Sequence, residues 1–191
     1  MAHKFGMASK KLGKVGKLYH GSIVKLNKGD LLNCNDSYNN SGTDKINGVF
    51  ATSSHEEARF FGLRGCISEI GITKLDADDS NKNIYVDNLR PTIIPQFYIY
   101  SVNPDRFNLD VRDEYVCTED VEIQEVEIIN VVDEFKLGGW HVFQVPRINR
   151  TRPMSKQFEQ MNEYIKTKNF IEVDIVGILF NQRMREKGKM K

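Results

Sequence analysis

The chain has 191 residues, of which 40% are hydrophobic and 28% charged, and its formal net charge is +1. This balance is that of an ordinary globular protein, and the length suits one domain with its own hydrophobic core rather than a disordered or fibrous chain. No apolar run approaches the roughly 20 residues of a membrane-spanning helix, and the lysine-bearing N-terminus lacks the apolar stretch of a secretory signal.

The small net charge hides an uneven distribution. Residues 1–17 carry five lysines and no acid, residues 105–134 carry eleven acids against two arginines, and the end of the chain is basic again. We interpret the basic termini as solvated tails, with electrostatic attraction to nucleic acid as the alternative. The three cysteines are odd in number and form no CxxC pair, which indicates neither a disulfide framework nor a zinc site. We therefore expect a cytoplasmic protein without a metal or a membrane segment.

The first third of the chain alternates short strands with polar loops. Three glycines break residues 1–16, which read as a flexible arm, and a strand follows over 18–25. Residues 33–48 are rich in Asn, Ser, Asp and Gly and predict a long loop. A second short strand over 48–51 leads into a helix, for which the sequence offers three N-cap residues and three apolar residues for the buried face: Thr52, Ser53 and Ser54, then Ala58, Phe61 and Phe60.

The rest of the chain predicts more strands than helices. A polar loop over 76–83 precedes a strand over 96–102. Further strands begin at 114 and span 121–131, the last with a bulge or an irregular turn. After the Gly138-Gly139 break and a basic loop over 146–153, we expect a helix over 154–168 and a strand over 170–180. This pattern predicts an α+β protein with a split or sandwiched β-core, divided into an arm (1–17), a core (18–137) and a C-terminal helix-strand extension (138–191) packed on the core.

Three separated segments carry residues that are suited to ligand binding or catalysis. Tyr19-His20-Gly21-Ser22 ends the first strand, and there the imidazole offers a hydrogen bond beside a backbone that a ligand can approach closely. An aromatic residue of Gly48-Val49-Phe50-Ala51 offers a stacking face for a planar ring. A carboxylate of Asp113-Glu114-Tyr115-Val116, at the start of a later strand, can stabilise a sugar cation as its leaving group departs.

Taken together, these segments resemble the diphtheria-toxin-like branch of the ADP-ribosyltransferases, which includes the poly(ADP-ribose) polymerases and the small rifamycin ADP-ribosyltransferases. His20-Gly21-Ser22 matches the family's His-Gly-Ser/Thr strand, and the resemblance covers roughly residues 18–135. It implies a split β-sandwich core in which His20 binds the adenosine ribose of NAD, the Gly21 backbone holds the nicotinamide carboxamide, and Glu114 engages the nicotinamide ribose and drives transfer.

The second motif departs from the family pattern, which usually has Tyr at the stacking position. Matching the Phe-Ala pair places Val49 there, whereas matching the following helix places Phe50 there. We prefer Phe50, because a phenyl ring still stacks on nicotinamide. The resemblance makes His20 and Glu114 the expected catalytic residues and assigns NAD binding to Tyr19, His20, Gly21, Ser22 and Phe50.

The leading hypothesis is thus an NAD-dependent ADP-ribosyltransferase that cleaves the nicotinamide–ribose bond and passes ADP-ribose to an acceptor. The acceptor can be a protein, a nucleic-acid group or a small molecule. One alternative is a weakly active or inactive module of the same fold that binds nucleotide or nucleic acid, which the missing Tyr and the basic termini favour. The other is a tRNA 2′-phosphotransferase-like activity, but the arginines which that reaction uses are missing from the strand segments.

Overall fold

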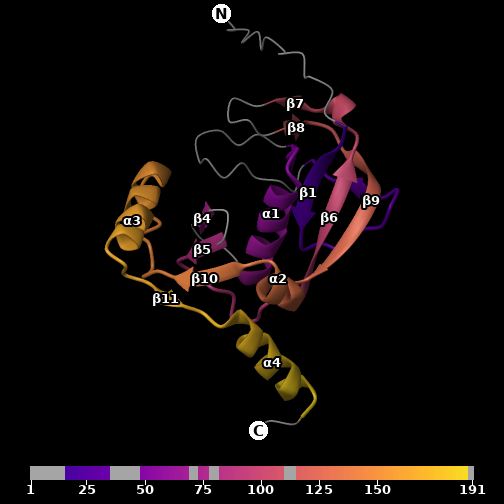
Figure 1. Ribbon diagram of the computed structural model, residues 1–191. Helices are drawn as coiled ribbons and strands as arrows, with labels where there is room; N and C mark the ends of the chain where they lie inside the picture. The colour runs from indigo at the N-terminus through magenta and orange to yellow at the C-terminus, as the bar shows by residue number, and fades with distance from the viewer. Residues whose placement is uncertain (1–15, 35–47, 69–72, 78–81, 110–114, 189–191) are drawn as a thin grey trace, which may run out of the picture.

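A computed structural model describes residues 16–34, 48–68, 73–77, 82–109 and 115–188 (Figure 1). Its strands are β1 (Leu18–Ser22), β2 (Leu31–Leu32), β3 (Val49–Ala51), β4 (Thr73–Ala77), β5 (Lys82–Val86), β6 (Gln96–Val102), β7 (Asn108–Leu109), β8 (Tyr115–Cys117), β9 (Val121–Asn130), β10 (Trp140–Gln144) and β11 (Ile171–Glu172). Its helices are α1 (His55–Ile67), the short 3-10 helix η1 (Pro104–Arg106), α2 (Val131–Leu137), α3 (Met154–Lys166) and α4 (Ile175–Glu186). The predicted α+β class is confirmed.

The first sheet is antiparallel, with strand order β1-β6-β9-β2. Strand β6 lies inside it, and its aromatic and β-branched side chains are buried from Phe97 to Val102, as expected for a strand with both faces covered. The predicted irregularity of β9 is confirmed as a register shift where it pairs with Ser101 and Val102 of β6. A separate three-stranded sheet, β3-β8-β7, is joined to the outer edge of β1 by one bridge between Tyr19 and Thr52.

The other four-stranded sheet has the order β11-β10-β5-β4, with β5 and β10 parallel. Strand β10 belongs to the predicted C-terminal extension, yet it pairs with β5 of the predicted core from Trp140 opposite Lys82 to Gln144 opposite Val86. Residues 138–191 therefore supply two strands of a sheet that residues 73–86 complete. Among the described helices, none is long and apolar enough to cross a membrane.

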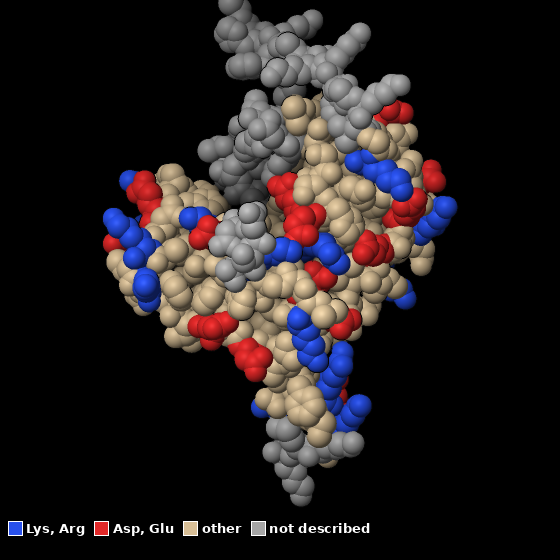
Figure 2. Space-filling view, viewed as in Figure 1, with Lys and Arg blue, Asp and Glu red and all other residues tan. Residues whose placement is uncertain are grey.

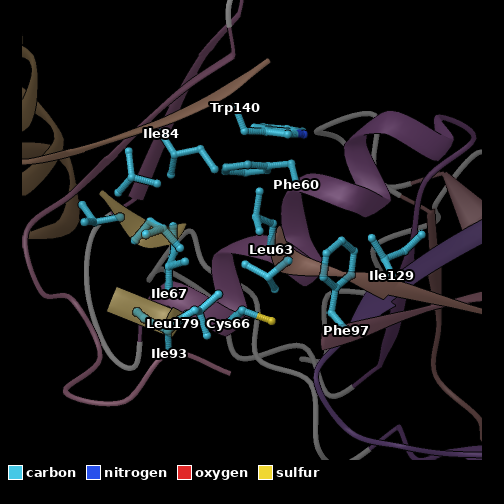
Figure 3. Close-up of a cluster of buried hydrophobic side chains, with 14 of the residues drawn as sticks. Phe60, Leu63, Cys66, Ile67, Ile84, Ile93, Phe97, Ile129, Trp140 and Leu179 are labelled. Atoms are coloured by element: carbon cyan, nitrogen blue, oxygen red, sulfur yellow. The ribbon is translucent and has the colours of Figure 1, made fainter. Parts of the chain in front are cut away.

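Helix α1 packs between the two four-stranded sheets. Its N-cap is Ser54, whose hydroxyl oxygen accepts from the Glu57 N–H. Figure 3 shows its side chains reaching both ways, with Phe60 under Trp140 on one side and Leu63 near Phe97 on the other. Phe60 is buried at 8% exposure while Phe61 is half-buried, so the helix turns Phe60 more fully into the core than Phe61.

The last predicted strand is wrong. Only Ile171 and Glu172 form β11, and from Ile175 the chain is the helix α4, which projects from the body in Figure 1. The Asp174 side chain caps this helix by accepting from the Gly177 N–H at 2.8 Å. Ile175, Ile178 and Leu179 then all pack against the core, and this i, i+3, i+4 spacing fits one face of a helix, whereas strand alternation would turn Ile178 to the other face.

Candidate functional site at the open edge of β1

The pairing of β1 with β3 begins and then stops. Tyr19 and Thr52 exchange two backbone hydrogen bonds, Tyr19 N–H to Thr52 O at 2.8 Å and Thr52 N–H to Tyr19 O at 2.9 Å. In an antiparallel ladder the next such pair would be Gly21 and Phe50. Instead, the Phe50 carbonyl oxygen is hydrogen-bonded to Nδ1 of the His20 ring at 2.7 Å. We call the β3-facing side of residues 20–22 the open edge of β1.

The open edge leaves polar backbone groups without a strand partner. Because Tyr19 bonds to β3, strand alternation turns the N–H and C=O of Gly21 toward β3 as well, away from β6. No residue in the described ranges bonds to them across this edge. A peptide donor and acceptor side by side match the needs of a primary carboxamide, which also has one acceptor and donors.

Gly21 is required by the packing of α1. A Cβ atom built at this position would lie 1.9 Å from the Ala58 carbonyl oxygen and 2.8 Å from the Gly62 nitrogen. Helix α1 therefore crosses β1 at a distance that only glycine permits. This close approach explains the His-Gly pair structurally, while binding through the Gly21 backbone stays a prediction.

The His20 side chain is held in one tautomer. A carbonyl oxygen only accepts, so Nδ1 must carry the hydrogen that bonds to Phe50. Burial lowers the pKa of His20 below its ordinary value of 6.5, and the Phe50 carbonyl opposes this only in part. The imidazole is thus neutral at pH 7, and Nε2 is an acceptor to which no described residue donates. Such a nitrogen suits a sugar hydroxyl, which can donate to it.

The ring of Phe50 lies on the opposite face of the strand pair from the ring of His20. Directly opposed residues share a face, so Tyr19 and Thr52 fix Gly21 and Phe50 on one face and His20 and Ala51 on the other. Phe50 is half-buried and belongs to no buried cluster in the described part, whereas Val49 is 1% exposed in the core beneath β3. The geometry favours Phe50 over Val49 as an aromatic surface for a ligand.

Tyr19 and Ser22 have partners of their own. The Tyr19 ring meets the ring of His55 edge-on, with centroids 5.1 Å apart, on the α1 side of β1. Its side chain therefore points away from that of His20, as neighbours on a strand must. The Ser22 hydroxyl oxygen accepts from the Val24 N–H at 3.1 Å and closes the turn after β1. Contact of either residue with NAD stays a prediction.

The third motif begins next to the second. Strand β8 pairs with β3 through Tyr115 opposite Ala51 and Cys117 opposite Val49. The order of strands is therefore β1, β3, β8, the three that carry the motifs. Glu114, the predicted catalytic acid, lies outside the described residues, one position before Tyr115. Of the nearby acids, Glu119 pairs with Arg106 at 2.5 Å and Asp120 accepts from the Cys34 N–H at 3.0 Å.

A further carboxylate reaches this region that sequence reasoning did not place there. Glu57 occupies the position of a capping-box acid, but its carboxylate accepts from the hydroxyl of the buried Thr52. The Thr52 oxygen in turn accepts from the Ser54 N–H at 3.0 Å. Glu57 thus links the start of α1 to the bridge that joins β3 to β1. Its position three residues after Ser54 indicated only a helix start.

No family model matches the sequence, and comparisons with curated proteins and with solved structures give no match either. The geometry of the open edge and the resemblance of the three motifs are therefore the features that bear on function.

Proposed function

We propose that the protein is an NAD-dependent ADP-ribosyltransferase whose NAD site is the open edge of β1, and that its core has the split β-sandwich of that superfamily. The observation that carries the proposal is the bond from His20 Nδ1 to the Phe50 carbonyl. This bond joins the first two motifs, which are 30 residues apart in the sequence. It also stands where the next backbone pair of β1 and β3 would form, at the place where the resemblance implies NAD binding. The order β1, β3, β8 brings the strand after Glu114 beside the second motif.

The described residues fit this substrate. The neutral Nε2 of His20 would accept from a ribose hydroxyl, and the N–H and C=O of Gly21 would hold the nicotinamide carboxamide. Phe50 shares a face with Gly21, so its phenyl ring would cover the nicotinamide ring. These roles require no charge on His20, which agrees with the lowering of its pKa by burial.

The reaction breaks one bond and forms another at C1′ of the nicotinamide ribose. The C1′–N bond breaks with its electron pair leaving on nicotinamide, which departs neutral. An acceptor oxygen or nitrogen attacks C1′ and loses its proton. Positive charge develops on the ribose in between, so the Glu114 carboxylate would stabilise the transition state while His20 and Gly21 orient the substrate. The acceptor belongs to a protein, a nucleic acid or a small molecule.

A second candidate is a module of the same fold that binds nucleotide without turnover. The observation that favours it is Phe50 itself, since phenylalanine supplies the aromatic face of the usual Tyr but not its hydroxyl. This candidate predicts nucleotide binding at the open edge without release of nicotinamide.

Nicotinamide release from NAD, followed by chromatography, tests the proposal. We expect slow release by the wild type and loss of release in His20→Asn, which keeps a donor for the Phe50 carbonyl but has no Nε2. The matched control is His141→Asn, because His141 pairs with Glu172 at 3.0 Å in the β11-β10-β5-β4 sheet, outside the proposed NAD site. Absence of release together with no calorimetric heat at millimolar NAD would overturn the proposal, while heat without release would favour the binding module.

A further inference from the structure

A hollow of about 500 Å³ lies at the β11-β10-β5-β4 sheet, away from the open edge of β1. It lies at the end of β10, beneath the basic loop 146–153 and the turn that follows α3. Its polar lining includes Arg147, Lys168, Asn169 and Gln144, and its apolar lining includes Phe170. A hollow of this size holds a ligand as large as a nucleotide.

The basic loop is anchored from below. The side chain of Asp87 is fully buried, and its carboxylate accepts from the Ile148 N–H at 3.2 Å and from the Arg150 guanidinium. Ile148 is itself buried in a small cluster with Tyr85 and Met161. Asp87 lines the hollow, but Arg150 balances its charge, so it does not make the hollow acidic. Arg147 therefore belongs to a loop that the buried Asp87 and Ile148 fix to the sheet.

Lys168 occupies a position where helix geometry favours glycine. The end of α3 is a Schellman motif, in which the Lys168 N–H bonds to Ile165 O at 3.1 Å and the Asn169 N–H bonds to Tyr164 O at 2.8 Å. The first of these two donor residues must have a left-handed backbone, and Lys168 has φ of 54°. Lys168 alone has a positive φ among the non-glycine residues described. A lysine bears this conformation at a cost that glycine would avoid, and its side chain lines the hollow.

The cations around the hollow have no acidic partner among the residues that the structure describes. Within the described ranges no acid pairs with Arg147 or Lys168, nor with Arg152 farther along the same loop. By contrast, Lys156 on α3 pairs with Glu159 at 2.7 Å. In Figure 2, basic side chains also stand out at the left of the molecule, where α3 lies.

We propose that this hollow binds the phosphate group of a nucleotide, either free or within a nucleic-acid strand. The Arg147 guanidinium and the Lys168 ammonium would donate to the phosphate oxygens, and the side-chain amides of Asn169 and Gln144 would complete the set of donors. The hollow is separate from the open edge of β1, so this site stands or falls independently of NAD cleavage.

Fluorescence anisotropy with a 5′-fluorescein-labelled deoxythymidine decamer tests the site. We expect binding at low salt that Arg147→Ala and Lys168→Gly each weaken about tenfold or more, the range of a lost charge-assisted hydrogen bond. Lys168→Gly also suits the left-handed turn, so its Tm should stay unchanged or rise by about 1–3 °C. A stable variant with lost binding is an outcome that a structural role for Lys168 does not predict.

The matched control is Lys187→Ala, which removes one charge at the C-terminal end of α4 and should change binding less than twofold. In Figure 1, α4 projects at the bottom of the molecule, apart from α3 at the left. Unlabelled competitors distinguish the sources of the phosphate. Competition by AMP indicates a single-nucleotide site, and competition by the unlabelled decamer alone indicates a strand. The proposal is overturned if the decamer does not bind, if both hollow variants bind like wild type, or if Lys187→Ala weakens binding as much as they do.

Discussion

The two edges of strand β1 are built differently. Toward β6, all five residues are paired, from Leu18 opposite Val102 to Ser22 opposite Tyr98. Toward β3, one pair forms and then the His20 ring takes the next carbonyl. On the β6 side, the backbone groups of β1 form hydrogen bonds within the sheet. On the open edge, the Gly21 N–H and C=O are left for another partner. Continuous pairing builds the core, and the interruption is where a ligand can be held.

The largest effect expected on the open edge is on chemistry. Glu114→Gln should lower the rate of nicotinamide release by roughly 10²–10³-fold, or about 3–4 kcal/mol, because a neutral amide does not stabilise positive charge on the ribose. NAD affinity by calorimetry should change little. The controls are Asp113→Asn, the acid next to Glu114 in the sequence, and Glu119→Gln, whose partner is Arg106. Loss of turnover in a control instead would mean that the third motif is aligned out of register.

The next largest effect is on stability. Gly21→Ala should lower the free energy of unfolding by roughly 3 kcal/mol or prevent folding, since the added methyl group meets the α1 backbone rather than a movable side chain. Urea denaturation measures this. Gly16→Ala is the control, because a Cβ there meets nothing within 4 Å. A Gly21→Ala protein of wild-type stability would contradict the close crossing of α1 over β1.

Phe50 and Val49 separate ligand binding from packing. Phe50→Ala should weaken NAD binding about tenfold, the order of a lost aromatic contact, and cost little stability because the ring is half-buried. Val49→Ala should do the reverse, since it leaves a cavity at a position that is 1% exposed. Calorimetry and thermal melting on both variants decide. A large stability loss with normal NAD affinity in Phe50→Ala would exclude its ring from the site.

The smallest effect is a pH dependence. Burial lowers the pKa of His20 in the folded state, so the unfolded chain binds more protons in mild acid. The free energy of unfolding should therefore fall as the pH drops from about 7 through 6.5 toward the lowered pKa, by at most about 1.4 kcal/mol per unit of pKa shift. His20→Asn should flatten this slope. An equal slope in both proteins would mean that His20 does not titrate with a lowered pKa.

Local signals in the sequence predicted some elements well but missed α2 and β10, and β4 and β5 extend into the loop expected over 76–83. The strand over 96–102 ends where Asn103 caps η1, and the helix from 154 ends within two residues of its expected limit. The strand over 170–180 failed because Ile171, Val173 and Ile175 alternate by coincidence. The cap at Asp174 and the i, i+3, i+4 spacing of Ile175, Ile178 and Leu179 favour a helix instead.

Long-range contacts at the site could not be predicted. Tyr19 bonds to the backbone of Thr52, and the His20 ring bonds to the Phe50 carbonyl. Both contacts depend on how two strands that are distant in the sequence come together. The same holds for the Glu57 carboxylate, which reaches Thr52 rather than completing the capping box. The sequence indicated which motifs matter, but the open edge that joins the first two is a tertiary feature.

The most direct test of the central claim is a ¹⁵N NMR spectrum of the histidine side chains, with and without NAD. Comparison with His20→Asn assigns the His20 signals. The account predicts a neutral ring at pH 7 with its hydrogen on Nδ1, and a shift of the Nε2 signal when NAD is added, as this nitrogen accepts from the substrate. A hydrogen on Nε2, or an Nε2 signal that NAD leaves unmoved at concentrations where binding is measured, would contradict it.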